Sequence, residues 1–228
     1  MDKIEEGIKS DPTKLLRDIA GIDELKKGED ILALASKQKE AAQSIVRWPA
    51  SLLKKACKPV ELPISVEVQK QVEHMISVMR LLNGVGIAAN QLGYDNRIFI
   101  AWFGAREDED VVPMINPVLL DVRGDWVDMK EACLSGAGCV GTIKRRAFAH
   151  VKWIDLQGFE QSALFTEWDA RIIQHEMDHL NGVCIIDKFN AMDKMANRFE
   201  MEKLQIQAGI LPDRLRKRGY VVQPRQKP

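Results

Sequence analysis

The stretch QHEMDHLNG, residues 174–182, carries the most specific pattern in this chain of 228 residues. It contains H-E-x-x-H, in which His175 and His179 lie one turn apart on the same face of a helix. Two such imidazoles can bind one ion, because neutral ring nitrogens suit Zn²⁺ and other first-row divalent ions. Glu176, beside them, is placed to take a proton from an attacking water and pass it to a leaving amine. The stretch therefore predicts a hydrolase that uses one metal ion.

The helix around this stretch is predicted to bury the face that carries the histidines. Trp168 and Ile172 fall on the same i, i+3, i+4 stripe as the two rings. Thr166 followed by Asp169 is a capping-box pattern that opens the helix, and Asn181-Gly182 ends it. The alternative is that two ordinary core histidines happen to fall four apart. It is disfavoured because the chain contains only four histidines in all.

A catalytic metal site also needs a third protein ligand and an open position. Cys133, at the end of a predicted strand, is the candidate, although spacing alone hardly separates it from Cys139 and Cys184. Cys184 follows the helix too closely to return over its face. For any single cysteine, the alternative is a small buried hydrophobic residue.

Composition excludes several classes of protein. Lys plus Arg and Asp plus Glu each number 33, so the formal net charge is zero. Charge therefore favours neither specific DNA nor an anionic membrane as a partner. No run approaches the ~20 apolar residues of a membrane span. Four cysteines form no dense disulfide framework, which favours a reducing compartment. The cytoplasm is the expected location, and an organelle matrix is the alternative if a targeting segment has been removed.

The periodicity of apolar residues predicts an α+β fold, with small mixed or antiparallel sheets around a central metal-binding helix. Three parts are expected: a helical N-terminal extension (1–45), a metallohydrolase domain (46–190), and a C-terminal helix with a basic tail (191–228). The predicted elements are a helix over 63–82, strands over 97–102, 114–120, 126–134 and 151–156, and one helix marked by Met192, Met195, Ala196 and Phe199.

Three segments, in order, resemble the peptide deformylase family, whose members remove the N-formyl group from the initiator methionine of nascent chains. Residues 84–91, GVGIAANQ, match the family pattern G-φ-G-φ-A-A-x-Q. Residues 131–135, EACLS, match E-G-C-L-S with one change, and residues 174–182 match Q-H-E-x-D-H-L-x-G. The similarity covers roughly residues 46 to 190.

The resemblance implies a role for each matching position. Cys133, His175 and His179 would be the metal ligands. Glu176 would act first as general base and then as general acid. Gln91 and the backbone N–H of Leu134 would form an oxyanion pocket that stabilises charge developing on the formyl oxygen.

The substrate pocket follows less directly from the motifs. Val85, Trp168 and Ile172, together with Leu134, would form the apolar slot for the methionine side chain, and plain core packing is the alternative for each. Gly86 would let the backbone approach the peptide substrate closely. Glu131, grouped with this pocket, resembles a family position close to the ligands, where it could orient one of them. Asp178 could orient an imidazole or be a solvated carboxylate.

The resemblance also implies a divalent ion, with Fe²⁺ expected in the cell and Zn²⁺, Ni²⁺ or Co²⁺ in a purified sample. Formyl-Met nascent peptides are the expected partners. The basic tail, which includes Arg214 and Arg216, could contact ribosomal RNA or simply be solvated.

Two other functions fit parts of the sequence. A different H-E-x-x-H metallopeptidase would usually take a later His or Glu as its third ligand, and no His follows His179. A catalytically weak or silent protein that binds N-terminal peptides or the ribosome is suggested by departures from the family pattern. These are Asn90, Ala132 and the run 136–138, and Ala132 would be strained if its position required a positive φ.

Overall fold

The structure, a computed structural model, describes residues 27–103 and 111–218. The helices and strands within these residues are α2 (Lys27–Ser44), α3 (Val66–Leu81), β1 (Gly86–Ala88), β2 (Ile98–Trp102), β3 (Val111–Ala132), β4 (Val140–Ile154), β5 (Glu160–Thr166), α4 (Glu167–Leu180), α5 (Ala191–Ala196), α6 (Arg198–Gln207) and α7 (Asp213–Arg216). Short 3₁₀ turns are η1 (Ser51–Lys54), η2 (Ala89–Leu92), η3 (Leu134–Gly136) and η4 (Ile185–Lys188).

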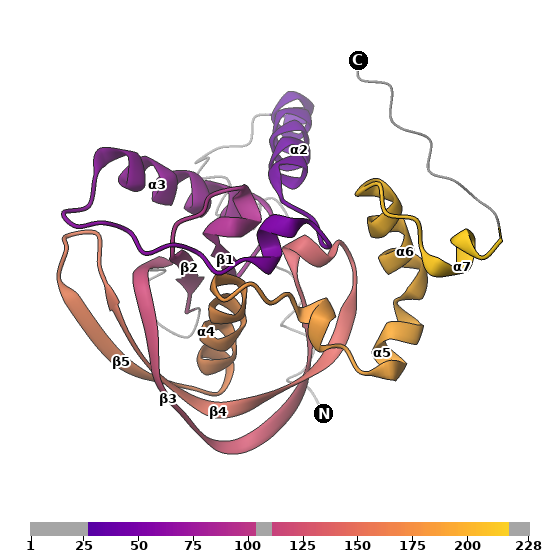
Figure 1. Ribbon diagram of the computed structural model, residues 1–228. Helices are drawn as coiled ribbons and strands as arrows, with labels where there is room; N and C mark the ends of the chain where they lie inside the picture. The colour runs from indigo at the N-terminus through magenta and orange to yellow at the C-terminus, as the bar shows by residue number, and fades with distance from the viewer. Residues whose placement is uncertain (1–26, 104–110, 219–228) are drawn as a thin grey trace, which may run out of the picture.

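The five strands form one sheet in the order β1-β2-β3-β4-β5, and every neighbouring pair is antiparallel. The sheet curves around α4, which lies in its hollow, while α5, α6 and α7 lie to one side (Figure 1). The expected combination of helices with a small antiparallel sheet is therefore confirmed.

Strand β2 explains how the sheet is held between two helices. Successive side chains of a strand point to opposite faces. Accordingly, Phe99 and Ala101 belong to the same buried cluster as Ile173 of α4. Ile98 and Ile100 belong to a second cluster with residues of α3. The apolar run predicted over 97–102 is thus a strand buried on both faces, with α4 on one side and α3 on the other.

The predicted strands over 114–120 and 126–134 are not separate. They belong to the single long strand β3, which ends at Ala132. Its pairing with β4 shifts register at three places, between Ile115 and Val118, between Leu119 and Asp121, and between Arg123 and Trp126. The first shift spans a proline, which cannot donate to a ladder, and the last spans Gly124 at a φ of 82°. These interruptions looked like strand ends in the sequence but only bend one strand.

Two further strands have no counterpart among the predictions. β1 lies inside the motif 84–91, and β5 follows β4 and pairs with it. β5 has a largely polar sequence and is mostly exposed, so it lacks the alternation that would have marked it. The predicted strand over 151–156 is the second half of β4, which begins at Val140.

Helix α4 begins and ends where the sequence indicated, with Thr166 before its first residue and Asn181 after its last. The capping box is wrong in one respect, because the Thr166 side chain caps no N–H within the described residues. Glu167, the next residue, has a φ of 49°, so the chain enters the helix by an unusual turn.

The single C-terminal helix that we expected is two helices, α5 and α6, which meet at Asn197. The Asn197 side chain donates to the carbonyl of Val140 at 2.8 Å and accepts from its N–H at 3.0 Å. An asparagine bonded to backbone in this way competes with helix continuation. Met192, Met195 and Phe199, which marked the expected helix, are exposed.

Helix α2 supplies the described part of the predicted N-terminal extension; residues 1–26 lie outside the described residues. Ala41, near its end, and Ile45, just after it, are buried in the same cluster as Met75 of α3. The end of the extension is therefore part of the core.

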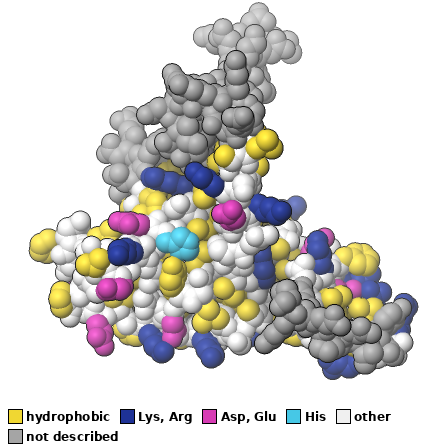
Figure 2. All heavy atoms as spheres, turned by 90° about the horizontal axis from the view of Figure 1, so that it is seen from above, with side chains coloured by type: hydrophobic (Ala, Val, Ile, Leu, Met, Phe, Trp, Pro, Cys, Tyr) yellow, Lys and Arg dark blue, Asp and Glu magenta, His cyan; other side chains and the backbone are white. Residues whose placement is uncertain are grey.

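In the described residues no helix is long and apolar enough to cross a bilayer. On the face drawn in Figure 2, acidic and basic side chains are interspersed.

Gly182 fixes the exit from α4. Its φ is 78°, and a Cβ added there would lie 2.7 Å from the backbone carbon of Lys54. Replacement by alanine therefore combines a left-handed backbone with a clash against η1. We expect Gly182→Ala to lower the free energy of unfolding by about 2–3 kcal/mol or more, measured by urea titration.

The matched control is Gly158→Ala, at a φ of 89° with no atom within 4 Å of an added Cβ. It carries the backbone cost alone, about 1 kcal/mol. Equal losses in the two variants would contradict the role given to the contact with Lys54.

Candidate metal centre and active site

Three side chains from two distant segments meet at one point. Cys133 follows β3, whereas His175 and His179 lie on α4, and one ligand atom from each falls within 4.8 Å of the other two. The Cys133 Sγ is 3.1 Å from the Nε2 of His179. Burial lowers the pKa of His179 well below its usual value, so its ring is neutral, the form that binds a metal. A thiolate and two imidazoles make a donor set that fits a divalent first-row ion.

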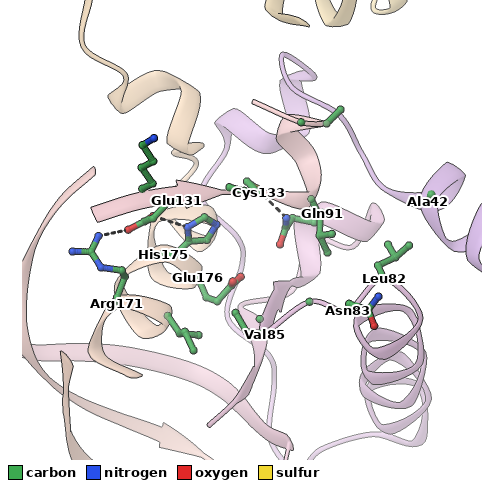
Figure 3. Close-up of a pocket in the computed structure, with 18 of the residues that line it drawn as sticks. Ala42, Leu82, Asn83, Val85, Gln91, Glu131, Cys133, Arg171, His175 and Glu176 are labelled. Carbon is green, nitrogen blue, oxygen red and sulfur yellow. Dashed lines mark hydrogen bonds and ion pairs between the residues drawn. The ribbon is translucent and has the colours of Figure 1, made fainter. Parts of the chain in front are cut away.

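The orientation of His175 is set by Glu131. The ring Nδ1 of His175 donates to Oε2 of Glu131 at 2.9 Å, which leaves Nε2 free to face the other two ligand atoms. The contact is drawn in Figure 3. Burial would raise the pKa of Glu131, but hydrogen bonds from Arg145 and His175 outweigh it and hold that pKa well below its usual range. Glu131 is therefore ionised, and both of its oxygens accept hydrogen bonds.

Two buried arginines donate hydrogen bonds to this carboxylate. Arg145 donates from Nε and Nη2 to the two oxygens of Glu131 at 2.6 and 2.8 Å. Arg171 donates to Oε1 at 2.6 Å and also reaches the carbonyls of Val127 and Ile143. A buried ion pair is stable only when its remaining donors and acceptors are satisfied, and here they are.

Asp178 extends the same network. Its carboxylate accepts from Arg145 at 2.8 Å and from Lys188. It thus acts on Arg145, which in turn holds Glu131, and not directly on a ligand imidazole. Neither earlier interpretation, a direct contact with a ring or a solvated carboxylate, describes it.

Glu176 faces the pocket beside the ligands (Figure 3). Only 4% of its surface is exposed, and its Oε2 has no hydrogen-bond partner among the described residues. Burial raises its pKa to about 7. Gly86 makes room for it, because a Cβ at that position would lie 2.4 Å from Oε1 of Glu176. A carboxyl with a pKa near neutrality and a free oxygen is suited to accept and return a proton.

Gln91 lies beside Cys133. Its Oε1 accepts from the N–H of Ala88 at 2.8 Å, which fixes the amide so that Nε2 points to Cys133 Sγ at 3.5 Å and to Ser135 Oγ at 3.3 Å. Leu134 directly follows the cysteine and begins η3. An amide donor and a backbone N–H therefore lie close to the same point.

A pocket of about 500 Å³ opens onto these groups. It collects nearly every residue that the sequence had singled out: Val85, Gly86, Gln91, Glu131, Cys133, Leu134, Trp168, Ile172, His175 and Glu176. His179 is 1% exposed and lies behind this lining, against the cysteine. Ile172 is buried, whereas Trp168 is 47% exposed and belongs to the rim.

The departures from the family pattern are accommodated. Ala132 lies in β3 and is not among the described residues with positive φ, so its side chain causes no backbone strain. The turn after η3 has Ala137 at a φ of 44° and Gly138 at 92°. Asn90 donates from Nδ2 to the carbonyl of His179 at 2.6 Å and so links η2 to α4.

Cys184 is not expected to be the third ligand, because it follows the helix too closely to return over its face. It is buried in the same apolar cluster as Cys133. It is not among the three residues whose ligand atoms share one point. Cys139 is buried in the same apolar cluster.

Sequence reasoning missed Arg145, Arg171 and Arg47. Arg145 falls on the buried face of β4, two positions after Ile143, and this period of two was a signal that could have found it. Arg171 lies in the run ARII on the apolar side of α4, where a charged residue implies a buried partner. Arg47, which lines the pocket, had no such signal.

A model of the family described as polypeptide deformylase matches residues 42–195. The chain is 34% identical to the peptide deformylase of Thermodesulfovibrio yellowstonii over 155 residues, which cover 68% of this chain and 93% of that protein. It is 39% identical to the peptide deformylase of Thermoanaerobacter pseudethanolicus over 137 residues, 60% of this chain and 82% of that one.

Solved structures agree with these relatives. A peptide deformylase from Synechococcus elongatus, in complex with actinonin, superposes with a TM-score of 0.63 at 28% identity, over 73% of this chain and 87% of that chain. A Plasmodium falciparum peptide deformylase gives 0.66 at 28% identity, over 70% and 94%. Since the family model spans well over half of the sequence and includes the whole cluster at Cys133, the chain belongs to the polypeptide deformylase family.

Proposed function

We propose that this protein removes the N-formyl group from the N-terminal formyl-methionine of nascent polypeptides and releases formate. The observation that carries the proposal is the cluster of Cys133, His175 and His179, with the carboxyl of Glu176 facing the same pocket. Its Oε2 has no hydrogen-bond partner in the part of the chain that the structure describes. Membership of the deformylase family supports the choice of a formamide as substrate. A silent binding protein is disfavoured, because every ligand and proton-transfer residue is present.

Cys133 Sγ and the two Nε2 atoms would hold the ion. When bound, a divalent ion polarises the formyl carbonyl and makes water more acidic. We propose Fe²⁺ as the ion in the cell, while Zn²⁺, Ni²⁺ and Co²⁺ also suit a donor set of one sulfur and two nitrogens.

Glu176 would transfer the proton. Its carboxylate takes a proton from the attacking water and then gives it to the amine nitrogen of methionine as the C–N bond breaks. A pKa raised by burial to about 7 suits both steps, because neither protonation state is strongly favoured at neutral pH.

Gln91 and Leu134 would bind the formyl oxygen as it gains negative charge. Gln91 Nε2 already points to the cysteine, and its amide is held by Ala88. Donors fixed in advance do not need to reorganise during the reaction, which is the reason such pockets stabilise transition states.

The methionine side chain would enter the apolar part of the pocket. Val85, Leu134 and Ile172 line it, and Trp168 would close the rim. The backbone at Gly86 would lie along the substrate peptide.

We place the reaction in the cytoplasm, where formylated chains are made. Ribosome contact through the tail gains little support, because Arg214 is paired with Glu202 and residues 219–228 lie outside the described residues.

The test of this function is formate release from a formyl-Met peptide by protein loaded with Fe²⁺ without oxygen. A chelator should abolish release, and added Fe²⁺ should restore it. Glu176→Gln should lower kcat by about 10²–10⁴-fold, since the carboxylate that moves the proton is lost. The variant should still bind one ion per chain, because Glu176 is not one of the three ligands.

Glu167→Gln is the matched control, an exposed carboxylate at the start of the same helix. It should leave kcat unchanged. Full activity of Glu176→Gln would contradict the assigned role, and absence of formate release by the loaded wild-type protein would contradict the function itself.

A second prediction concerns Glu131. Glu131→Gln leaves Arg145 and Arg171 buried without their carboxylate and removes the anion that orients His175. We expect metal affinity to fall about 10–100-fold, measured by competition with a chromogenic chelator. The free energy of unfolding should fall by about 3–5 kcal/mol.

Glu160→Gln, which breaks the exposed pair with Lys152, is the comparison. It should cost at most about 1 kcal/mol and leave metal affinity unchanged. Similar metal affinity in the wild-type protein and Glu131→Gln would exclude the orienting role.

A further inference from the structure

Residues 46–48 tie together the two loops that carry Gln91 and Leu134. The Val46 N–H donates to the Gln91 carbonyl at 2.7 Å, and the Trp48 N–H donates to the Ser135 carbonyl at 3.0 Å. Both loops of the proposed oxyanion pocket are therefore fixed by one short segment that directly follows α2.

Arg47, in the middle of this segment, makes two further links. Its guanidinium donates through Nη1 to the carbonyl of Leu134 and through Nη2 to the carbonyl of Ala42 at 2.8 Å. The side chain is also part of the pocket wall. A planar guanidinium can hold two carbonyls at once in a fixed geometry, which an ammonium group does less well.

The link to Ala42 has a clear physical reason. Ala42 lies in the last turn of α2, where carbonyls have no partner within the helix. A cation is favourable at this end because the helix dipole is negative there. The Ser44 hydroxyl satisfies the neighbouring carbonyl of Ala41 at 2.8 Å. Arg47 is thus anchored on α2 and extends from it to Leu134.

We propose that Arg47 is a positioning residue for the deformylation reaction, holding the carbonyl of Leu134 so that the Leu134 N–H stays directed at the formyl oxygen. This inference rests on the proposed function. It also gives the described part of the N-terminal extension a task, since α2 becomes the support for one side of the oxyanion pocket.

The effect should appear in kcat more than in KM. Leu134 opens the three-residue turn η3, so its backbone direction depends on how its own carbonyl and that of Ser135 are held. Small displacements of a donor weaken transition-state stabilisation strongly. The apolar slot for methionine depends on other side chains, such as Val85 and Ile172, so ground-state binding should change little.

The experiment compares Arg47→Met with the wild-type protein, both loaded with Fe²⁺ under anaerobic conditions. Methionine keeps an unbranched chain but no donor. We expect kcat to fall about 10–100-fold and KM for a formyl-Met peptide to stay within about 3-fold, since an interaction that acts in the transition state is lost. Amide hydrogen exchange of the peptide that contains Leu134 should become faster, a readout independent of activity.

Arg80→Met is the matched control, an exposed arginine in the last turn of α3. It should leave kcat and hydrogen exchange as in the wild-type protein. If Arg47→Met does not fold, Arg47→Lys and Arg47→Gln take its place, and each should lower kcat at least about 3-fold because neither reproduces the two-carbonyl link.

Three results would overturn the inference. One is a kcat of Arg47→Met within twofold of the wild-type value. The second is a rise in KM with kcat unchanged, which would make Arg47 a group that binds the peptide. The third is unchanged hydrogen exchange around Leu134. If the wild-type protein releases no formate, the proposed function fails, whereas hydrogen exchange still tests the tie between Arg47 and Leu134.

Discussion

The hydrogen bond between Glu131 and His175 is the interaction on which the centre depends. Helix α4 is buried in the hollow of the sheet, so the polar groups on its inner face must find partners within the protein. Glu131 accepts a hydrogen bond from His175, and Arg145 and Arg171 donate hydrogen bonds to Glu131. Because burial alone would favour a neutral carboxyl, the hydrogen bonds from Arg145 and His175 are what keep Glu131 ionised.

Strand β3 brings this carboxylate and the cysteine to the helix together. Glu131 and Cys133 are two positions apart, so both point to the buried side while Ala132 between them is exposed. The register with β4 fixes this, with Glu131 opposite Gly141. A slip of one residue would turn both side chains away from α4, because the period of a strand is two. The register of β3 therefore places both Cys133, the candidate ligand, and Glu131, which orients His175.

The centre joins three parts of the chain that are far apart in sequence. α4 contributes the imidazoles and Glu176, the end of β3 contributes the thiol, and the segment after α2 fixes the loops around Gln91 and Leu134. Gly86, in β1, packs directly against this centre, since any side chain there would occupy the space of Glu176. In the proposed reaction, proton transfer and substrate approach would share one narrow region, formed by β1 on one side and α4 on the other.

The sequence by itself determined the helix that carries His175 and His179, its ends, and the residues that converge on the pocket, because these depend on local periodicity and on motifs with fixed spacing. It could not choose among Cys133, Cys139 and Cys184 by spacing, and it left Asp178 with two wrong interpretations. It also divided β3 into two strands and joined α5 to α6. Only the tertiary structure decided these points, and only it revealed Arg47, Arg145 and Arg171. The reason is physical: which cysteine meets the imidazoles, and which arginine meets a buried carboxylate, depends on strand register and helix packing between residues far apart in the chain, and no local pattern records those contacts.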